Sequence, residues 1–364
     1  MTLMTFVYLV AGLVLLVLGA EWLVRGAARL ATRFGISPLI IGLTVVAFGT
    51  SAPETAVSVG AALDGSGDIA IGNVVGSNIA NVLLILGASA LIAPLLVSRQ
   101  LIRLDVPIMI VAGAATYALA FDGSLSRLDG ALLFAGIVVY TLFLIYKSRQ
   151  DKSTSGDEFS DEYGADQAGQ RPAWRDLVLI VAGLALLIQG SDFLVTGAVA
   201  LARTLGLSEL VIGLTVVAVG TSLPELATSV MAALRGERDI AVGNIVGSNI
   251  FNLLCVLGLA SLVSPNPIPV AANALAFDFP VMLAVSLACL PIFFTGFSIA
   301  RWEGLLFVLY YAAYTLYLVL VSTGRPFAET LGHALLGYAL PLTAVTLAVL
   351  ALRYWRLHRR VGAG

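Results

Sequence analysis

Two glutamates stand inside otherwise apolar stretches of this chain, each at the end of a shared motif. Glu54 ends the motif GTSAPE and Glu225 ends the motif GTSLPE. An ionised carboxylate at the centre of a bilayer costs at least about 2.5–3.5 kcal/mol on insertion scales, so such a group faces a protein interior or a cavity and marks function. If both stretches cross a membrane, the pair predicts chemistry with cations.

Each glutamate follows residues that interrupt a helix and residues that carry hydroxyl groups. The helix breakers are Gly49, Pro53, Gly220 and Pro224. Proline removes a backbone donor and clashes with the carbonyl four residues back, so backbone carbonyls near 47–50 and 218–221 become available to a cation. Interrupted backbone survives at membrane depth only where it lines a cavity. The hydroxyl groups that add oxygen ligands are those of Thr50, Ser51, Thr221 and Ser222.

The stretch after each glutamate carries polar residues spaced by four, which form one stripe on a helix. The two stripes are Asn73, Ser77 and Asn81, and Asn244, Ser248 and Asn252. We expect the serines and the last asparagine of each stripe to face the broken helix. For Asn73, Asn78, Asn244 and Asn249 a role in joining helices stays open. Carboxylate, hydroxyl, amide and carbonyl oxygens without thiolate or imidazole suit Ca²⁺ or Na⁺ rather than zinc or copper.

These motifs belong to an internal duplication. Residues 35–87 and 206–258 align without a gap at an offset of 171, and 36 of the 53 positions are identical. The likeness extends over about five apolar runs in each half. An odd number of spans turns the second copy upside down, and inverted repeats of this kind build secondary transporters with a site at mid-membrane.

Composition supports a membrane protein. Hydrophobic residues make up 59% of the 364 residues and charged residues 12%, with a mean hydropathy of +0.98; soluble domains have about 25% charged residues. Eleven runs are long enough to cross a bilayer, the seventh at 209–234 and the eleventh at 334–353. No signal peptide is expected because no Lys or Arg precedes the first run. We expect an all-α polytopic protein of two inverted five-helix repeats, a ten-helix core, with one extra C-terminal transmembrane helix.

The expected organisation has four parts. They are an N-terminal repeat (1–147), a cytoplasmic linker (148–174), an inverted C-terminal repeat (175–322) and an accessory eleventh helix with a basic tail (323–364). With the N-terminus outside, seventeen of the twenty Lys and Arg residues fall on the cytoplasmic side, as the positive-inside rule requires. The linker and C-terminus are then cytoplasmic in a multi-pass protein of the cell membrane.

At GTSAPE with GNVVGSNIANVLLILG, and at GTSLPE with GNIVGSNIFNLLCVLG, the chain resembles the calcium/cation antiporter superfamily, in particular the prokaryotic type of sodium/calcium exchanger. The resemblance covers about the first 322 residues. It implies one Ca²⁺ site between Glu54 and Glu225. It also implies flanking Na⁺ sites formed by Thr50, Ser51, Ser77, Asn81, Thr221, Ser222, Ser248 and Asn252, with the carbonyls of Ala47 and Ala218.

One departure from the family pattern concerns potassium. Some relatives, including the potassium-dependent exchangers, have Asp where this chain has Asn252. We therefore expect no potassium co-transport.

The same residues leave one alternative function open. A calcium/proton exchanger that uses the same glutamates is the alternative function, whereas an enzyme is not expected because HExxH and GxSxG are missing. We expect no cofactor besides the transported ions, no nucleic-acid partner, and a monomer in the lipid bilayer.

Glu21 is expected to pair with Arg25, with a gating role as the alternative. Asp105 and Asp278, each two residues before a proline, are expected to end helices.

Overall fold

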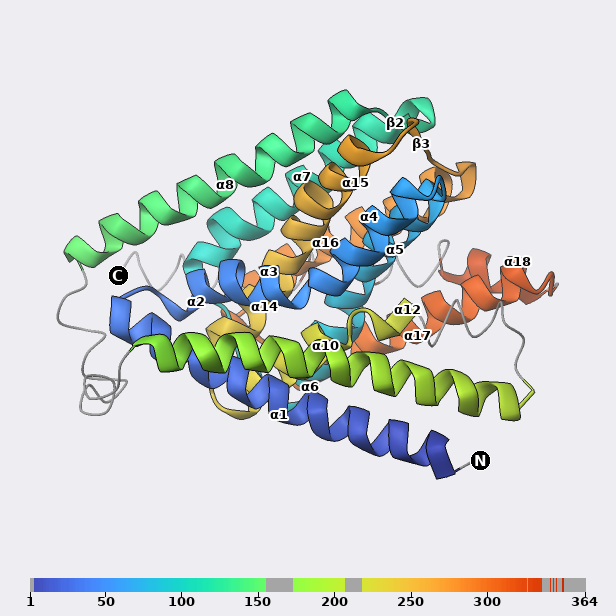
Figure 1. Ribbon diagram of the computed structural model, residues 1–364. Helices are drawn as coiled ribbons and strands as arrows, with labels where there is room; N and C mark the ends of the chain where they lie inside the picture. Colours follow the sequence, from blue (N-terminus) through green and yellow to red (C-terminus); the bar gives the residue numbers. More distant parts are fainter. Residues whose placement is uncertain are drawn as a thin grey trace.

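A computed structural model describes residues 3–154, 173–206, 218–325 and 327–335, with positions 341, 343, 345 and 349 beyond them. Helices account for most of these residues (Figure 1). The first repeat runs in the order α1 (Leu3–Phe34), α2 (Pro38–Ile41), η1 (Gly42–Val46), α3 (Ala47–Thr50), α4 (Ala52–Leu63), α5 (Gly67–Ala80), η2 (Asn81–Leu86), α6 (Gly87–Ile92), β1 (Leu95–Leu96), η3 (Leu101–Asp105), α7 (Val106–Leu119), η4 (Ala120–Asp122), β2 (Ser124–Leu125) and α8 (Arg127–Thr154).

The second repeat follows the same plan. It runs in the order α10 (Ala173–Thr204), α12 (Ala218–Gly220), α13 (Leu223–Leu234), α14 (Arg238–Phe251), η6 (Asn252–Val256), α15 (Leu257–Val263), β3 (Ile268–Pro269), η7 (Ala274–Asp278), α16 (Phe279–Phe294), β4 (Ser298–Ile299) and α17 (Arg301–Ser322), after which comes α18 (Phe327–Ala334). The π-helical turns η1, η2, η3, η6 and η7 lie within longer helical runs, whereas η4 is a short 3₁₀ turn.

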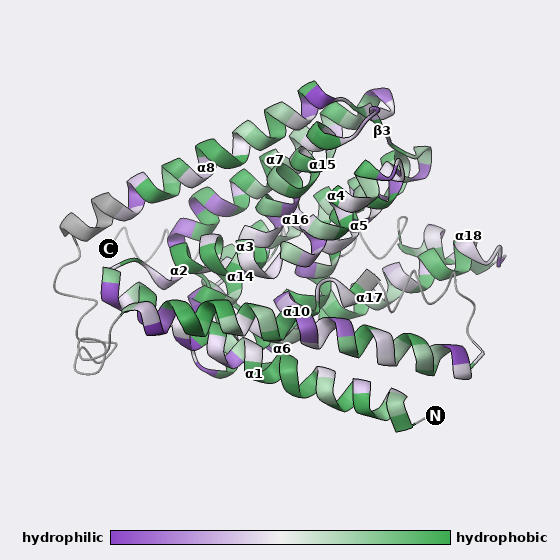
Figure 2. Cartoon of the chain, in the orientation of Figure 1, coloured by the Kyte–Doolittle hydropathy of each residue, from purple (hydrophilic) through white to green (hydrophobic). Residues whose placement is uncertain are grey.

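Eight described helices are long and apolar enough to cross a membrane, and the pair Pro38–Thr50 with Ala52–Leu63, bent by 47°, makes a ninth span. Of the two other expected spans, 209–234 is described only from Ala218 on, and 334–353 lies mostly outside the described residues. Apolar residues cover most of α8 and of the first half of α1 (Figure 2). The all-helical, multi-pass architecture is confirmed.

Two short antiparallel strand pairs join the repeats. β1 pairs with β4, and β2 pairs with β3. Because β1 and β3 hold equivalent places in the two repeats, as do β2 and β4, each pair is the copy of the other. The next backbone bonds repeat the relation, with Val97 N donating to Phe297 O at 2.8 Å and Val270 N to Gly123 O at 2.9 Å. The two halves are therefore related by a pseudo-twofold axis.

The first helices of the two repeats, α1 and α10, lie side by side and run in opposite directions (Figure 1). Glycines spaced by seven residues form the contact on each helix, at Gly12, Gly19 and Gly26 and at Gly183, Gly190 and Gly197. A Cβ added to Gly19 would lie 2.8 Å from the carbonyl oxygen of Gly183. Small residues of this kind let helix backbones approach closely in a membrane.

The helices do not end at Asp105 and Asp278, so this expectation is wrong. Each aspartate closes a π-helical turn and the span continues beyond it, from Leu101 to Asp122 and from Ala274 to Phe294. Proline deprives a carbonyl of its partner, but the changed hydrogen-bond register of a π turn accommodates the loss. Tyrosine hydroxyls satisfy both acids, with Tyr140 donating to Asp105 at 3.1 Å and Tyr314 to Asp278 at 2.9 Å.

The α1–α10 contact predicts opposite effects for the same substitution at two helical glycines. Gly19→Ala gains about 1 kcal/mol of helix propensity, but overpacking of the interface costs about 1–3 kcal/mol, so the protein should lose stability. Gly60→Ala is the matched control because no atom of the described residues lies within 4 Å of its added Cβ, and it should keep or gain stability. Thermal unfolding of the purified protein in detergent measures both. Equal shifts in the unfolding temperature would contradict the packing.

Candidate functional site

The break in the second span brings Glu54 into the protein interior. α3 ends at Thr50, α4 begins at Ala52, and Ser51 forms the junction with φ −83° and ψ 12°. Proline is tolerated in the first turn of a helix because the amide there has no partner within the helix, and Pro53 lies in this turn. Glu54 is fully buried in the same turn, where the positive end of the helix dipole stabilises a carboxylate.

The second repeat has the same break, and the carbonyl of Gly220 at this break accepts a hydrogen bond from a side chain. Ser222 forms the junction with φ −91° and ψ 9°, and Glu225 is fully buried in the first turn of α13. Pro224 has no amide for the carbonyl of Gly220, four residues back. The hydroxyl of Ser191 on α10 donates to this carbonyl at 2.6 Å. The motif analysis missed Ser191, because the equivalent position in the first repeat is Ala20.

The two alanine carbonyls at the breaks differ in their surroundings. The Ala47 carbonyl accepts hydrogen bonds from Ser51 N at 3.0 Å and from Thr50 Oγ1 at 3.4 Å. In the second repeat, Ser222 N donates instead to the carbonyl of Val219, at 3.1 Å. A cation at the Ala47 carbonyl would therefore share this oxygen with two hydrogen-bond donors. The carbonyl of Ala218 does not accept the equivalent bond from Ser222 N.

Each glutamate accepts a hydrogen bond from the serine of the other repeat. Ser51 Oγ donates to Glu225 Oε1 at 3.1 Å, and Ser222 Oγ donates to Glu54 Oε1 at 3.2 Å. Each serine precedes the glutamate of its own repeat by three residues, so both carboxylates converge on one place between the repeats. All four side chains are at most 2% exposed. The structure thus brings these four residues together, while their role as ion ligands stays a prediction.

The threonines and the first asparagines form a second reciprocal pair. Thr50 Oγ1 donates to Asn244 Oδ1 at 3.1 Å, and Thr221 Oγ1 donates to Asn73 Oδ1 at 3.4 Å. Each asparagine amide also binds a serine on the broken helix of its own repeat, in the pairs Asn73–Ser58 at 2.9 Å and Asn244–Ser229 at 3.0 Å. These two asparagines therefore join helices, which was the alternative left open for them.

The rest of the two polar stripes is buried on helices that contact the broken helices. Ser77 Oγ accepts from Ser222 Oγ at 3.3 Å, which places the stripe of the first repeat against the break of the second. Asn81 Nδ2 donates to Asn249 Oδ1 at 2.9 Å, a contact that sequence analysis did not foresee. The equivalent of Asn81 is Asn252, and neither polar atom of its amide has a hydrogen-bond partner. Ser248, like Asn252, is fully buried.

Several buried oxygens of this cluster lack hydrogen-bond donors. They are Oε2 of Glu54, Oε2 of Glu225, Oδ1 of Asn81, Oδ1 of Asn252 and Oγ of Ser248. A buried oxygen without a partner costs about 1–3 kcal/mol, and two buried carboxylates add a larger penalty unless their charge is compensated. A hard cation satisfies both requirements, since Ca²⁺ takes 6–8 oxygen ligands from carboxylates, carbonyls and amides. The residues present fit such a cation.

The donor set of the cluster consists mostly of neutral oxygens. In the described ranges, no three or more His, Cys, Asp or Glu side chains gather at one place. Cys255 and Cys289 are both buried and free, which agrees with a packing role. The cluster thus offers two charges and many neutral oxygens, a combination suited to binding an ion reversibly.

Comparison with known proteins identifies relatives along most of the chain. Residues 4–146 and 176–320 match the family described as sodium/calcium exchanger protein. A putative antiporter, CaxA, of Alkalimonas amylolytica is 42% identical over 284 residues, which is 78% of this chain and 88% of that protein. The sodium/calcium exchanger MaX1 of Methanosarcina acetivorans is 35% identical over 340 residues, 85% of this chain and 97% of that protein.

Solved structures are similar as well. A structure of the sodium-calcium exchanger NCX_Mj soaked with Na⁺ and Ca²⁺ matches this chain with a TM-score of 0.72 and 32% identity. The match covers 88% of this chain and 99% of the other. The similar structures and the similar sequences thus both include sodium/calcium exchangers.

The two equivalent asparagines should contribute unequally to stability without ions. Asn81→Ala removes a buried hydrogen bond and leaves Asn249 Oδ1 without its donor, which costs about 1–3 kcal/mol. Asn252→Ala removes two atoms that have no partner, so its loss of stability should be smaller. Thermal unfolding in a chelating, sodium-free buffer compares the two variants. An Asn252→Ala protein that is as unstable as Asn81→Ala would contradict the described contacts.

Proposed function

The chain belongs to the sodium/calcium exchanger protein family, and from its buried polar cluster we propose that it exchanges Ca²⁺ for Na⁺ across the membrane by alternating access. The observation that carries the proposal is the reciprocal bonding of Ser51 to Glu225 and of Ser222 to Glu54. It makes one binding place from two halves of the chain, between the repeats, where secondary transporters bind their substrates.

In this proposal one Ca²⁺ lies between Glu54 and Glu225. Each carboxylate has one oxygen, Oε2, that accepts no hydrogen bond, so one oxygen from each repeat is available to the ion. The two ionised carboxylates carry a charge of −2, which a single Ca²⁺ neutralises. Neutral oxygens nearby complete the coordination that Ca²⁺ requires.

The flanking oxygens would hold the Na⁺ ions that replace Ca²⁺. The proposed ligands are Thr50, Ser51, Ser77, Asn81, Thr221, Ser222, Ser248 and Asn252, with the carbonyls of Ala47 and Ala218. The oxygens of Asn81, Ser248 and Asn252 that lack donors support this assignment. Hydroxyl and amide oxygens are hard ligands without charge, so they coordinate Na⁺ and leave the two glutamates to set the total charge.

Charge compensation explains exchange rather than leak. Two like charges in a low-dielectric interior repel each other and lose their hydration, so an empty cluster resists closure from water. A cluster neutralised by Ca²⁺, or by two or more Na⁺, loses most of this penalty and can be closed off and opened to the other side. Net transport then requires an ion in each direction, which is antiport.

The same proposal includes the arrangement in the cell membrane. The N-terminal repeat (1–147) and the inverted repeat (175–322) form the transport unit, with the N-terminus outside and the linker (148–174) and C-terminus in the cytoplasm. The excess of basic residues on one side supports this orientation. One chain contains both halves of the cluster, so a monomer in the bilayer suffices for transport.

Removing either central charge should stop calcium exchange. We expect Glu54→Gln and Glu225→Gln to abolish Ca²⁺ uptake into sodium-loaded proteoliposomes, because one remaining carboxylate cannot neutralise the ion. Glu303→Gln is the matched control, since Glu303 is also a buried glutamate in a span but caps the amide of Ala300 at 2.8 Å, a role that Gln keeps. Robust uptake by the Glu54→Gln/Glu225→Gln protein would overturn the site.

Calcium flux under separate gradients distinguishes Na⁺ from H⁺ as the coupling ion. A calcium/proton exchanger could use the same glutamates, but protons need no coordination shell, so the hydroxyl-rich flanks favour sodium. We expect an outward sodium gradient to drive Ca²⁺ uptake into vesicles with clamped voltage, and a pH gradient alone to drive little. Uptake driven by the pH gradient in sodium-free buffer would establish the proton alternative.

A further inference from the structure

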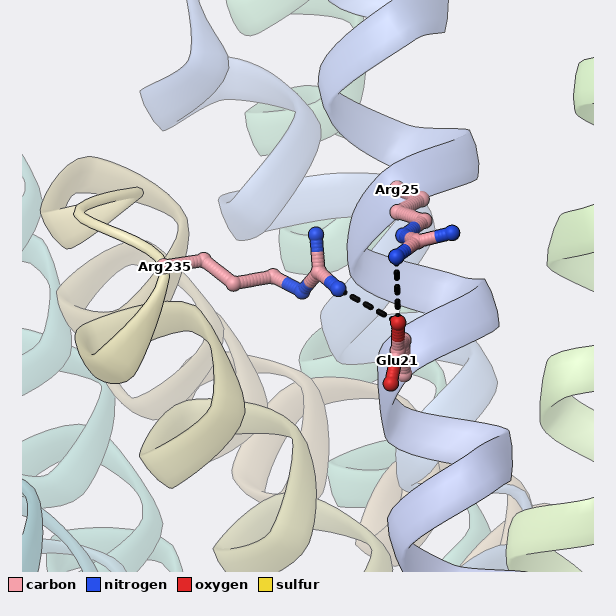
Figure 3. Close-up of polar contacts among 3 residues, drawn as sticks. All are labelled: Glu21, Arg25 and Arg235. Atoms are coloured by element: carbon pink, nitrogen blue, oxygen red, sulfur yellow. Dashed lines mark hydrogen bonds and ion pairs between the residues drawn. The ribbon is translucent and has the colours of Figure 1, made fainter.

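Glu21 on α1 contacts two arginines, one from its own helix and one from the other repeat (Figure 3). Its Oε1 lies 2.5 Å from Nη2 of Arg25 and 2.5 Å from Nη2 of Arg235. Arg235 follows the last residue of α13, where the chain turns into α14. The Glu21 and Arg235 side chains are only 28% and 30% exposed. The expected pair with Arg25 is thus present, and a second bond connects the repeats.

The pseudo-twofold relation assigns each member of this network a counterpart at the other end of the molecule. Glu21 corresponds to Asp192, Arg25 to Thr196 and Arg235 to Asp64. The counterpart of the ion pair is therefore a pair of acids, Asp192 and Asp64, which cannot form an ion pair with each other. Within the described residues, no ion pair involves Asp64 or Asp192. We call the two ends of the molecule the Arg235 end and the Asp64 end.

The packing of the broken helices also differs between these ends, and it is tighter at the Arg235 end, where the ion pair lies. α1 packs along α13 at the Arg235 end, whereas the equivalent helices α10 and α4 make only marginal contact. Thr228 on α13 is fully buried, and its counterpart Val57 on α4 is 41% exposed. The face of α13 that carries Thr228 is therefore buried where α13 packs along α1. The equivalent face of α4, which carries Val57, is exposed.

We propose that Glu21 and Arg235 form a latch that holds the Arg235 end of the transport pathway closed, and that the acids Asp192 and Asp64 leave the other end without one. The chain then favours the state in which the buried cluster is reached from the Asp64 end. This inference rests on the proposed alternating access. It assigns to Glu21 and Arg235 a role in access to the ions without contact with them.

Labelling of a cysteine at Thr228 tests the latch. In a protein with Cys255 and Cys289 replaced by Ala, Thr228→Cys should react with a membrane-impermeant maleimide added at the Arg235 end only when that end opens. Partly exposed ion pairs shift an equilibrium by about two- to five-fold. We expect Arg235→Gln and Glu21→Gln to raise the labelling rate by this factor, and Arg235→Lys to keep the rate of the parent.

Arg25→Gln is the matched control. Like Arg235→Gln, it removes one positive charge beside Glu21, but it leaves the bond from Arg235 that connects the repeats. The Thr228→Cys labelling rate should therefore stay unchanged. Asp64→Arg supplies the missing partner for Asp192 and should act in the opposite direction, slowing the labelling of Val57→Cys from the Asp64 end. An unchanged rate in Arg235→Gln, or an equal rise in Arg25→Gln, would overturn the latch.

Side-specific affinity provides the second readout. The apparent dissociation constant equals the intrinsic one divided by the fraction of molecules in the competent state. In Arg235→Gln the apparent Kd for Ca²⁺ applied at the Arg235 end should therefore fall about two- to five-fold, with little change at the Asp64 end. A wild-type protein that exchanges no Ca²⁺ would refute the proposed function, whereas the labelling rates report on the latch in either case.

Discussion

The burial of two carboxylates in one cluster is the constraint around which the molecule is built. Neither Glu54 nor Glu225 is exposed, and each accepts a hydrogen bond from a serine of the opposite repeat. Such charges persist inside a protein only when hydrogen bonds and counter-charges compensate them. The helix breaks serve this need, because each places a carboxylate in the first turn of a helix and a hydroxyl group just before it.

The helices around the cluster are arranged so that these contacts occur twice. The antiparallel α1–α10 pair and the two strand pairs connect the repeats at several places, and each contact has its counterpart across the pseudo-twofold axis. The site itself is less symmetric. Asn81 binds Asn249, but the equivalent bond from Asn252 is absent, and Ser191 supports Gly220 where the first repeat has Ala20.

The class of fold and the central residues of the site could be predicted from the sequence, because both depend on local patterns. Apolar runs predict spans, and a glutamate beside Gly and Pro inside such a run predicts a buried charge at a helix break. Contacts between distant segments could not be predicted in this way. The bonds of Ser191 to Gly220 and of Asn81 to Asn249 depend on how helices meet in space. The continuation of the helices beyond Asp105 and Asp278 depends on π-helical turns, which have no simple sequence signature.

The crossed serine–glutamate bonds have a consequence for the origin of the protein. A polypeptide with a single repeat contains a serine and a glutamate that cannot satisfy each other within one chain, because each contacts the other copy. Such an ancestor would complete the cluster only as a pair of molecules inserted in opposite directions. Once a gene fusion had joined two such repeats in one chain, each repeat could change its sequence independently. The opposite charges at the equivalent positions Asp64 and Arg235 are an example of such a change.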